Sequence, residues 1–415
     1  MSMLDLLADD RTWADFLRYK TGLTCPRDAE QSLRDFVSRR GWRPVVERIR
    51  RGEPFPLPRK TVLSKMGSAK KRTVYTYPKD ENTVLKLLTH LLLRRYDGLF
   101  SDGLYSFRPG RNAKDAVRRL TRLDLSRWRY YYKVDIHNYF NAVPVAAFLP
   151  MLEQALADDP ALFAFLRGLL KEPCVLENGR PVAERKGIMA GTPQSAFYAN
   201  LYLRGLDAAF AARGVPYARY SDDILVFAEG PAESAENRAF LLDWLARSGL
   251  EVNPAKEAAG ACADGWTFLG FSFRGGTVDI APATVQKLKD KMRRKTRALR
   301  RWQQRNCVEG ERAATAFLRV FNRKLLESPM DNELTWSYWF FSVINTADSL
   351  HEIDRYCQDC VRYLVSGTRT KARFRVRYDA LKRLGYRSLV HAYYDFEKNP
   401  EPAGQSPAEE AAPHA

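Results

Sequence analysis

The chain has 415 residues, 45% of them hydrophobic, which is enough for a buried core in two or three domains. A formal net charge of +18 at pH 7 favours a polyanionic partner, either nucleic acid or an acidic membrane surface. No apolar run of about 20 residues could span a bilayer, and residues 1–10 carry acids where a signal peptide has Lys or Arg, so we expect a cytoplasmic protein with no membrane partner.

The first 280 residues mix helical and strand-like segments, which predicts an α+β fold with a small sheet. In chain order, the spacing of apolar residues predicts helices at 13–19 and 29–37, a strand at 73–77, a helix at 83–96, a strand at 130–134, helices at 145–170 and 196–212, a hairpin at 215–228, a helix at 232–248, and strands at 250–252 and 266–273.

From residue 281 the chain is helical and basic, with 14 Lys and Arg against 4 Asp and Glu in residues 281–330. Like charges one turn apart destabilise a helix unless a polyanion neutralises them, so we expect this region to contact nucleic acid. The candidate contacts are Lys287, Lys291, Arg293, Arg294, Arg297 and Arg301. The tail at 399–415 is expected to be disordered, because it has little apolar bulk.

Two cysteines, Cys357 and Cys360, have the CxxC spacing of a zinc ligand pair. A zinc site needs two more ligands, and no second CxxC or histidine pair lies near them in the sequence. We therefore interpret them as two small residues one helical turn apart.

Three acids occupy strand-like surroundings: Asp222 and Asp223 are flanked by apolar residues, and Asp135 ends the run YYYKV. Acids are poor strand residues, and three neighbouring carboxylates would repel one another unless a cation lay among them. Magnesium prefers oxygen ligands and phosphates, and two such ions can activate a 3′-hydroxyl and stabilise leaving pyrophosphate. The alternative is that Asp-Asp is only the turn of an ordinary hairpin.

Five segments resemble motifs of the reverse transcriptases, in that family's order and at suitable spacing. They are 103–111 (GLYSFRPGR), 133–140 (KVDIHNYF), 220–227 (YSDDILVF), 253–256 (NPAK) and 268–271 (FLGF). The resemblance covers roughly half the chain and implies an RNA-directed DNA polymerase shaped like a right hand. It implies an N-terminal helical extension at 1–60, fingers at 61–130, a palm at 131–280 with fingers elements near 170–195, and a helical thumb with further C-terminal helices at 281–398.

The same resemblance implies that Asp135, Asp222 and Asp223 are catalytic and bind two Mg²⁺ ions, for which Mn²⁺ could substitute, and that the Ile136 carbonyl is a further ligand. Phe140 matches the bulky residue that crowds a ribose 2′-hydroxyl and so favours deoxynucleotides. A plain core aromatic is the other interpretation, and both can hold.

Further residues match the family's nucleotide and nucleic-acid contacts. Lys71 and Arg72 lie where the fingers present cations to the triphosphate, although a solvated basic turn would look the same. Lys256 could protonate the pyrophosphate or only neutralise it. Arg108 and Arg111 either stabilise the fold or hold template phosphates. The primer-grip hairpin corresponds to Phe268, Leu269 and Gly270.

The third palm motif departs from the family. Aligned without gaps, residues 187–203 place Ala190 where intron, retron and retroviral enzymes have glutamine, while Gly191 matches the glycine that lets the backbone approach the nucleotide. This version resembles the bacterial "unknown group" of defence-associated reverse transcriptases. It implies antiphage defence, with deoxynucleoside triphosphates, a DNA product and an RNA template that could be a dedicated non-coding RNA.

Three alternatives stay open. The first is a retroelement enzyme of the intron or retron kind, against which Ala190 and the lack of accessory nuclease motifs argue. The second is a template-independent or protein-primed polymerase of the abortive-infection type. The third is a catalytically silent RNA-binding scaffold, against which the three acids argue.

Overall fold

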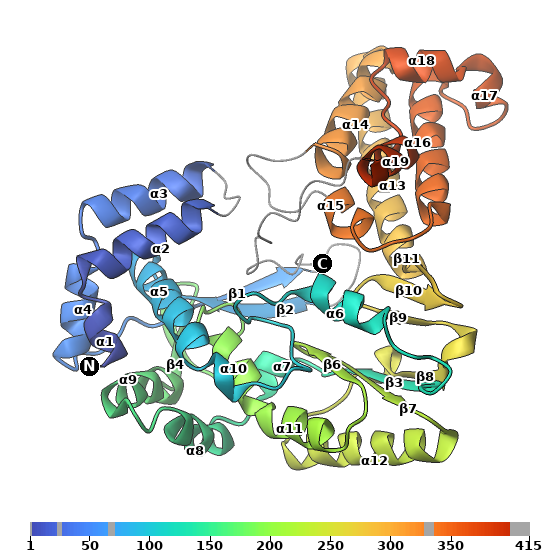
Figure 1. Cartoon of the computed structure of the whole chain (residues 1–415). Coiled ribbons are helices and arrows are strands. Elements are labelled where there is room, and N and C mark those ends of the chain that lie inside the picture. The colour runs from blue at the N-terminus through green and yellow to red at the C-terminus, as the bar shows by residue number, and fades with distance from the viewer. Residues whose placement is uncertain (1, 23–26, 65–70, 328–335, 399–415) are drawn as a thin grey trace. The chain divides into compact units, whose positions relative to one another are not determined.

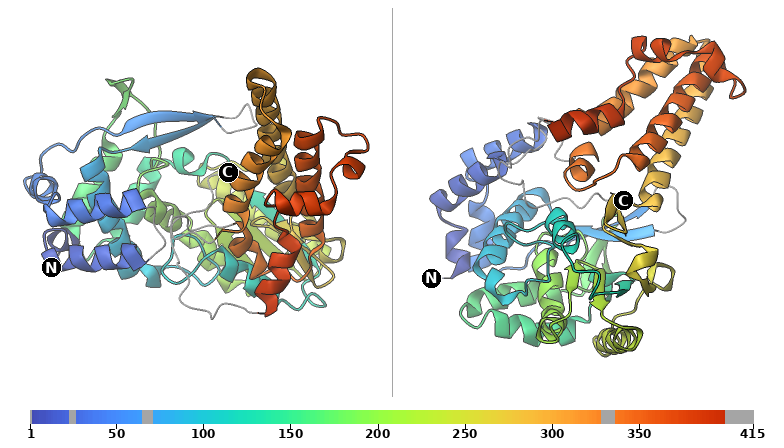
Figure 2. Two further views of the ribbon diagram at one scale, coloured as in Figure 1. Left: turned by 90° about the horizontal axis from the view of Figure 1, so that it is seen from above. Right: turned by 45° about the vertical axis from the view of Figure 1, so that its right-hand side comes forward.

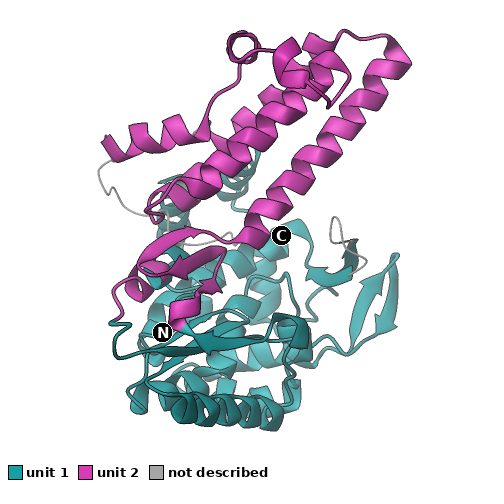
Figure 3. Ribbon diagram, turned by 90° about the vertical axis from the view of Figure 1, so that its right-hand side faces the viewer, with its two compact units in different colours: residues 1–116, 124–261, 407–415 teal, residues 117–123, 262–406 magenta. Residues whose placement is uncertain are grey.

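The computed structural model describes residues 2–22, 27–64, 71–327 and 336–398, so the predicted tail lies outside the described residues. The chain divides into two compact units, shown in Figure 3. Unit 1 contains residues 1–116, 124–261 and 407–415, and unit 2 contains residues 117–123 and 262–406. None of the helices that the structure describes is long and apolar enough to cross a membrane.

Unit 1 holds two four-stranded sheets and most of the short helices (Figure 1). Its helices are α1 Met3–Leu6, α2 Asp10–Gly22, α3 Arg27–Ser38, α4 Arg43–Arg50, α5 Lys79–Arg95, α7 Tyr139–Ala142, α8 Val145–Ala155, α9 Pro160–Lys171, α10 Ser195–Tyr202, α11 Arg204–Ala212 and α12 Pro231–Arg247, with short 3₁₀ turns at Asp97–Leu99 and Pro254–Lys256. Helix α6, Ala113–Leu120, runs from unit 1 into the first stretch of unit 2.

The N-terminal helices are joined by an aromatic core. The indole rings of Trp13 and Trp42 stack with their centroids 5.0 Å apart, and both are almost fully buried. Arg48 of α4 forms a 2.8 Å ion pair with Glu81 of α5. Both interactions lie within unit 1, so residues before 50 pack as part of it.

The palm sheet has the strand order β6-β7-β3-β8 and is antiparallel throughout. Its strands are β3 Tyr130–Asp135, β6 Tyr217–Tyr220, β7 Asp223–Ala228 and β8 Ala258–Ala261. Strand β7 is central and its residues 224–228 are fully buried, which explains why its sequence is an unbroken apolar run after the acid. Helix α12 packs against β3 and β7.

The fingers sheet has the order β2-β1-β4-β5, with strands β1 Arg59–Ser64, β2 Lys71–Thr76, β4 Cys174–Glu177 and β5 Arg180–Ala183. Strands β1 and β2 form an antiparallel hairpin, and β1 meets β4 in parallel at Arg59 and Leu176. Residues more than 100 positions apart therefore share one sheet.

Beneath the palm hairpin lies an ion pair whose two side chains are both fully buried. Arg219 of β6 donates through Nε and Nη2 to the two carboxylate oxygens of Asp207 in α11, at 2.7 and 2.6 Å. Tyr217 adds a hydrogen bond from its hydroxyl to Asp207 at 2.9 Å, and Arg219 Nη2 also donates to the carbonyl of Asn200 at 3.2 Å. The buried charges are thus paired and hydrogen-bonded, as burial requires.

Unit 2 combines a small antiparallel sheet of order β11-β10-β9 with a bundle in which α13, α14 and α16 pack on one another. Its elements are a 3₁₀ turn at Cys262–Asp264, β9 Trp266–Phe268, β10 Phe271–Arg274, β11 Thr277–Ile280, α13 Pro282–Asn306, α14 Gly310–Leu325, α15 Trp336–Phe341, α16 Asp348–Ser366, α17 Ala372–Arg375, α18 Tyr378–Arg383 and α19 Leu389–Lys398. Cys357 and Cys360 are buried on α16, and the described residues contain no metal-ligand group around them.

The α+β fold class predicted from the sequence is confirmed, and several predicted elements divide differently. The helix expected at 145–170 is two helices, because Asp159 caps α9 by accepting from the Leu162 amide at 3.2 Å and Pro160 follows at the first turn. The helix at 196–212 breaks at Leu203, and the strand at 250–252 reduces to a bridge between Val252 and Ile136.

Two further differences concern strands. The segment 266–273 is a pair of strands rather than one, because Leu269 and Gly270 both take positive φ values and turn the chain. Strands β1, β4, β5, β8 and β11 were not expected from the sequence. Each is four to six residues long, and β8 (AAGA) has no β-branched residue that would have marked it.

The buried ion pair gives a stability prediction. Asp207→Asn leaves the guanidinium of Arg219 buried without its counter-charge, and we expect the free energy of unfolding to fall by about 3–5 kcal/mol. Urea unfolding followed by tryptophan fluorescence measures it. Asp15→Asn breaks an ion pair with Arg18 whose side chains are 54% and 80% exposed, and should cost less than about 1 kcal/mol. Equal losses in the two variants would contradict the assignment.

Candidate active site

The palm hairpin brings two of the predicted acids face to face. Asp135 is the last residue of β3, Asp223 is the first residue of β7, and the strand register pairs them directly. Residues paired across antiparallel strands point to the same face of the sheet. Asp222 lies in the two-residue turn just before Asp223, so these two consecutive acids and Asp135, which lies far earlier in the sequence, gather at one end of the palm sheet.

The turn that carries Asp222 is held from both sides. Its other residue, Ser221, has a φ of +57°, which is unusual for a residue with a side chain. The Ser221 amide donates to the hydroxyl of Ser106 at 2.8 Å, and the Ile136 amide donates to the carbonyl of Asp222 at 3.0 Å. Strain of this kind persists where surrounding contacts fix the backbone.

Burial and mutual repulsion make these carboxylates hard to ionise together. Burial, followed by the charges of Asp222 and Asp135, raises the pKa of Asp223 to about 7. Burial and the charge of Asp135 also raise the pKa of Asp222, although Lys256 and Arg72 oppose that shift. The site therefore favours positive charge.

Cations of the protein already approach the acids. Lys256 places its ammonium 2.5 Å from Oδ2 of Asp135, with its side chain half exposed. Although burial lowers the pKa of Lys256, the hydrogen bond and charge of Asp135 outweigh it and the pKa is raised. Lys133 lies two residues before Asp135 on the same strand face, and burial lowers its pKa against the pull of Asp223 and Asp135.

The donor set fits a divalent cation in its chemistry, because it consists of hard carboxylate oxygens whose negative charges act on one another. In the part of the chain that the structure describes, no three Asp, Glu, His or Cys side chains are already arranged as a metal-ligand group. Lys256, rather than a third carboxylate, meets Asp135. Ile136 is buried beside Asp135, where its carbonyl was predicted as a ligand.

The residues predicted to contact the nucleotide lie on neighbouring elements of unit 1. Phe140 follows Asp135 by five residues, is half exposed on α7, and meets the ring of Phe107 edge-on with centroids 6.3 Å apart. Phe107 itself has a φ of +53°. Lys71 and Arg72 open strand β2 and are both exposed, and only Arg72 acts on the pKa of Asp222.

Gly191 is required by close packing. Its φ is +97°, and a Cβ atom there would lie 3.0 Å from the Tyr75 carbonyl oxygen and 3.2 Å from Val74 Cβ. Beside it, the Tyr75 amide donates to the Ala190 carbonyl at 2.7 Å. The neighbour that approaches this glycine in the structure is therefore strand β2.

The side chain of Ala190 has no amide group to replace the glutamine that intron, retron and retroviral enzymes have at this position. Ala190 is buried, and its amide donates to Oδ1 of Asn141 at 3.0 Å. Gln194, the next glutamine along the chain, is fully buried at the start of α10, so its amide group is not exposed on the surface. Neither atom of that group has a hydrogen-bond partner among the described residues.

The two arginines of the segment 103–111 are engaged within the fold. Arg108 is buried and makes a bidentate ion pair with Asp97 at 2.7 and 2.9 Å, with a further bond to the Ser101 carbonyl. Arg111 binds the side chain and carbonyl of Asp102 at 2.5 and 2.9 Å. Of the two roles left open by the sequence, these contacts favour stabilisation of the fold.

In unit 2, the predicted nucleic-acid contacts lie along α13, with apolar residues such as Leu288 and Leu299 on its buried side. All six cations are exposed: Lys287, Lys291, Arg293, Arg294, Arg297 and Arg301. The predicted primer grip forms the tight turn between β9 and β10, where Phe268 is buried and Gly270 O accepts the Ala281 amide at 2.8 Å.

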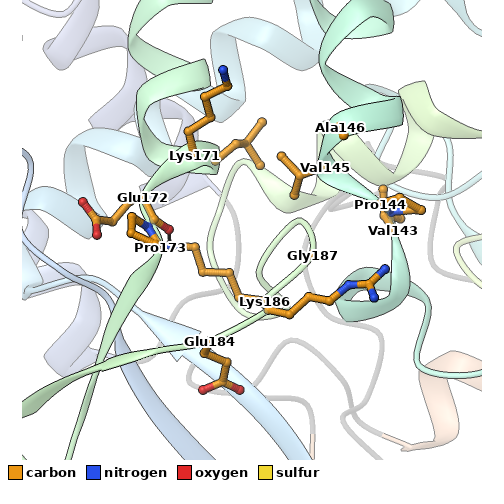
Figure 4. Close-up of a pocket in the computed structure, with 12 residues that line it drawn as sticks. Val143, Pro144, Val145, Ala146, Lys171, Glu172, Pro173, Glu184, Lys186 and Gly187 are labelled. Atoms are coloured by element: carbon orange, nitrogen blue, oxygen red, sulfur yellow. Dashed lines mark hydrogen bonds between the residues drawn. The ribbon is translucent and has the colours of Figure 1, made fainter.

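A separate pocket of about 360 Å³ lies in unit 1 between the start of α8, the end of α9 and the residues that follow β5 (Figure 4). None of the three acids lines it. Its lysine, Lys186, runs toward Glu172 and Pro173, where the ammonium donates to the Glu172 carbonyl, and burial lowers its pKa. This pocket therefore does not belong to the acid cluster.

Sequence reasoning missed the supports of the hairpin. Ser106, Asn200, Asp207 and Arg219 form a buried network that reaches Ser221. Nothing in the local pattern identifies these partners, because they lie up to 115 positions apart. Lys133 could have been found, since alternation along β3 places it on the face of Asp135.

The raised pKa of Asp223 predicts a pH dependence. Between its ordinary pKa near 3.8 and about 7, the folded, metal-free protein holds a proton that the unfolded chain has lost, so stability should fall as pH rises through this range. Asp223→Asn should reduce this fall and raise the free energy of unfolding at pH 8 by on the order of 2–4 kcal/mol.

Urea titrations at pH 5 and pH 8 in a chelator measure the effect. The exposed Glu236→Gln on α12 serves as the control and should change stability by less than about 0.5 kcal/mol at either pH. A parallel pH profile for wild type and Asp223→Asn would show that Asp223 ionises normally.

Comparison with known proteins identifies the family of the chain. The profile of "Reverse transcriptase (RNA-dependent DNA polymerase)" matches residues 63–273, which is 211 of the 415 residues. No curated protein sequence matches the chain.

Similar solved structures include apo telomerase from Candida tropicalis, with 10% identity over 82% of this chain and 62% of that one and a TM-score of 0.48. Telomerase from Candida albicans with a TWJ fragment of telomeric RNA has 10% identity over 83% of this chain and 66% of that one, with a TM-score of 0.45. A Candida tropicalis telomerase truncated from its C-terminal domain has 11% identity over 54% of this chain and 55% of that one, with a TM-score of 0.44. The chain spans 55–66% of the length of these telomerases. Because the profile covers more than half of it, the chain belongs to the reverse transcriptase family of RNA-dependent DNA polymerases.

Proposed function

We propose that the protein adds deoxynucleotides to a primer on an RNA template by two-metal-ion catalysis. The observation that supports this best is the direct pairing of Asp135 with Asp223, beside Asp222 in a turn fixed by Ser106. A silent scaffold has no use for acids gathered where burial and neighbouring negative charge raise the pKa values of Asp222 and Asp223.

Asp135, Asp222 and Asp223 would hold the ions, with the Ile136 carbonyl as a further ligand. Bound magnesium, or manganese in its place, supplies a Lewis acid that activates the primer 3′-hydroxyl and stabilises the leaving pyrophosphate. Lys256 lies ready to neutralise phosphate charge once Asp135 is engaged, because its half-exposed ammonium already sits at that carboxylate. Phe140, which is partly buried and follows Asp135 by five residues, would crowd a ribose 2′-hydroxyl.

For the biological setting we propose bacterial antiphage defence, with a structured non-coding RNA as template. The support is the departure at Ala190, in which the chain resembles the "unknown group" enzymes, together with the lack of an amide group in the side chain of that residue. Untemplated synthesis is the second candidate, because the same missing amide removes one contact to the incoming nucleotide. Sequencing the product decides between them: copied RNA sequence supports templating, and a homopolymer or random sequence contradicts it.

The catalytic assignment predicts that Asp222→Ala with Asp223→Ala abolishes nucleotide incorporation and leaves RNA affinity within about two-fold. The acids contribute ligands for the ions but little to holding a polyanion. Incorporation of labelled deoxynucleotide and filter binding of RNA measure the two effects. The control is Asp9→Ala with Asp10→Ala, which removes two consecutive exposed acids far away in sequence. Residual incorporation by the first variant would overturn the assignment.

The fingers strand gives a further prediction. Neighbouring residues on β2 point to opposite faces, and Arg72 is the one whose charge reaches Asp222. Arg72→Ala should therefore lower kcat/KM for deoxynucleotide about ten-fold or more, the loss expected for one charge-assisted hydrogen bond. Lys71→Ala, its matched neighbour, should lower it less than three-fold in steady-state extension assays. A larger loss for Lys71→Ala would reverse the assignment of faces.

A further inference from the structure

A second basic region lies at the end of α16 in unit 2, separate from the cations of α13. Between residues 369 and 387 the chain has eight Lys and Arg and a single acid, Asp379. The eight are Arg369, Lys371, Arg373, Arg375, Arg377, Lys382, Arg383 and Arg387, and all are exposed. We call this segment, which includes α17 and α18, the distal basic surface.

These cations have no acidic partners within the described residues. Elsewhere in unit 2, Lys289 pairs with Glu352 at 2.8 Å and Arg293 pairs with Asp290 at 2.9 Å. No ion pair between described residues involves any of the eight. Repelling charges gathered without counter-charges are stabilised by a polyanion.

An aromatic ring stands in the middle of this surface. Phe374 is 77% exposed, the most exposed of the large hydrophobic side chains in the described residues. The segment is anchored, because Ala372 and Val376 on either side are buried. Arg373 and Arg375 flank the ring directly. An exposed aromatic among arginines can stack on a nucleic-acid base while the cations hold phosphates.

The surface suits nucleic acid better than a membrane. Helices that lie on lipid need a continuous apolar face over several turns. Here α17 has four residues and α18 has six, and Phe374 is followed by Arg375 and Arg377. Six of the eight cations are arginines, whose planar heads bind phosphate in a bidentate way and stack on bases.

The distal basic surface is far from the turn predicted to grip the primer. Helix α16 begins beside β11, where the Ser349 hydroxyl donates to Asp279 at 2.7 Å, and it ends at Ser366 next to α17. Nineteen residues of helix span roughly 28 Å. Figure 1 and Figure 2 show α17 and α18 at the end of the bundle opposite β9–β11.

We propose that residues 369–387 form a second nucleic-acid site that takes single-stranded RNA, with Phe374 stacked on an unpaired base. A ring needs a base that is free of its partner, so single strands and loops are favoured over duplex. The choice of RNA rests on the proposed function, in which part of the template RNA lies beyond the copied stretch.

Fluorescence anisotropy on the full chain tests the site, with a labelled mixed-sequence 20-nucleotide RNA, single-stranded or annealed to its complement. Phe374→Ala should raise Kd for the single strand about ten-fold and change Kd for the duplex less than two-fold. Phe374→Tyr should restore binding, because it keeps the ring.

Replacing Arg373, Arg375 and Arg377 by Ala together should weaken both RNAs and lower the salt slope by about 2, the value for three phosphate contacts on a single strand. The control replaces three scattered exposed cations of unit 1, Arg11, Lys86 and Arg167, by Ala and so removes the same charge. It should change Kd less than three-fold. Thermal melts check that each variant is folded.

Equal effects of the clustered and scattered variants would overturn the proposal, as would an unchanged Kd for Phe374→Ala. Binding to vesicles of phosphatidylserine and phosphatidylcholine tests the alternative that this surface binds a membrane. If binding to them, and not to RNA, depends on Phe374, the surface is a lipid site. Extension of a short primer–template is measured separately. If Phe374→Ala loses affinity for RNA but the wild-type protein does not extend the primer, the result refutes the proposed function while supporting this site.

Discussion

The ion pair between Arg219 and Asp207 lies wholly inside the protein, and the geometry of the acid cluster depends on it. Two buried charges are expensive to desolvate, and they persist here because each guanidinium nitrogen and both carboxylate oxygens make a hydrogen bond. The same guanidinium reaches the carbonyls of Asn200 and Ser221, at 3.2 and 3.4 Å. The turn of the hairpin is thereby linked to helices α10 and α11.

That linkage matters because the acids above it repel one another. Asp135 and Asp223 are paired by strand register, and nothing in their own charges favours the pairing. The backbone places them together, and Lys256 partly neutralises them. The buried support and the half-exposed cation thus have different tasks: the first fixes distances, and the second can be displaced by another positive charge.

Much of the palm could be predicted from the sequence, because its signals are local. The apolar run after Asp223 marks a buried strand, and the YYYKV run marks its partner, so the meeting of the acids followed from motif order. Strand β8 could not be predicted, since it pairs with β3 from a distant part of the chain and its residues, AAGA, carry no β pattern. The network around Ser106 escaped for the same reason.

The arginines show the opposite failure. Arg108 and Arg111 sit in a motif that suggests contact with nucleic acid, yet tertiary partners, Asp97 and Asp102, take up their guanidinium groups. A charge in a sequence says nothing of the counter-charge that folding brings to it. By the same reasoning, the exposed and unpartnered cations beyond α16 are informative only because the fold leaves them without acids.

Gly191 has a consequence for a residue it never touches. Its bare Cα lies against Val74 and Tyr75, so β2 rests on this loop with no space between them. Any side chain at 191 would displace the strand, and the displacement would pass along it to Arg72, two residues before Val74. The charge that Arg72 places near Asp222 is therefore positioned in part by an uncharged residue, because the absence of a side chain at Gly191 lets β2 pack directly on the loop.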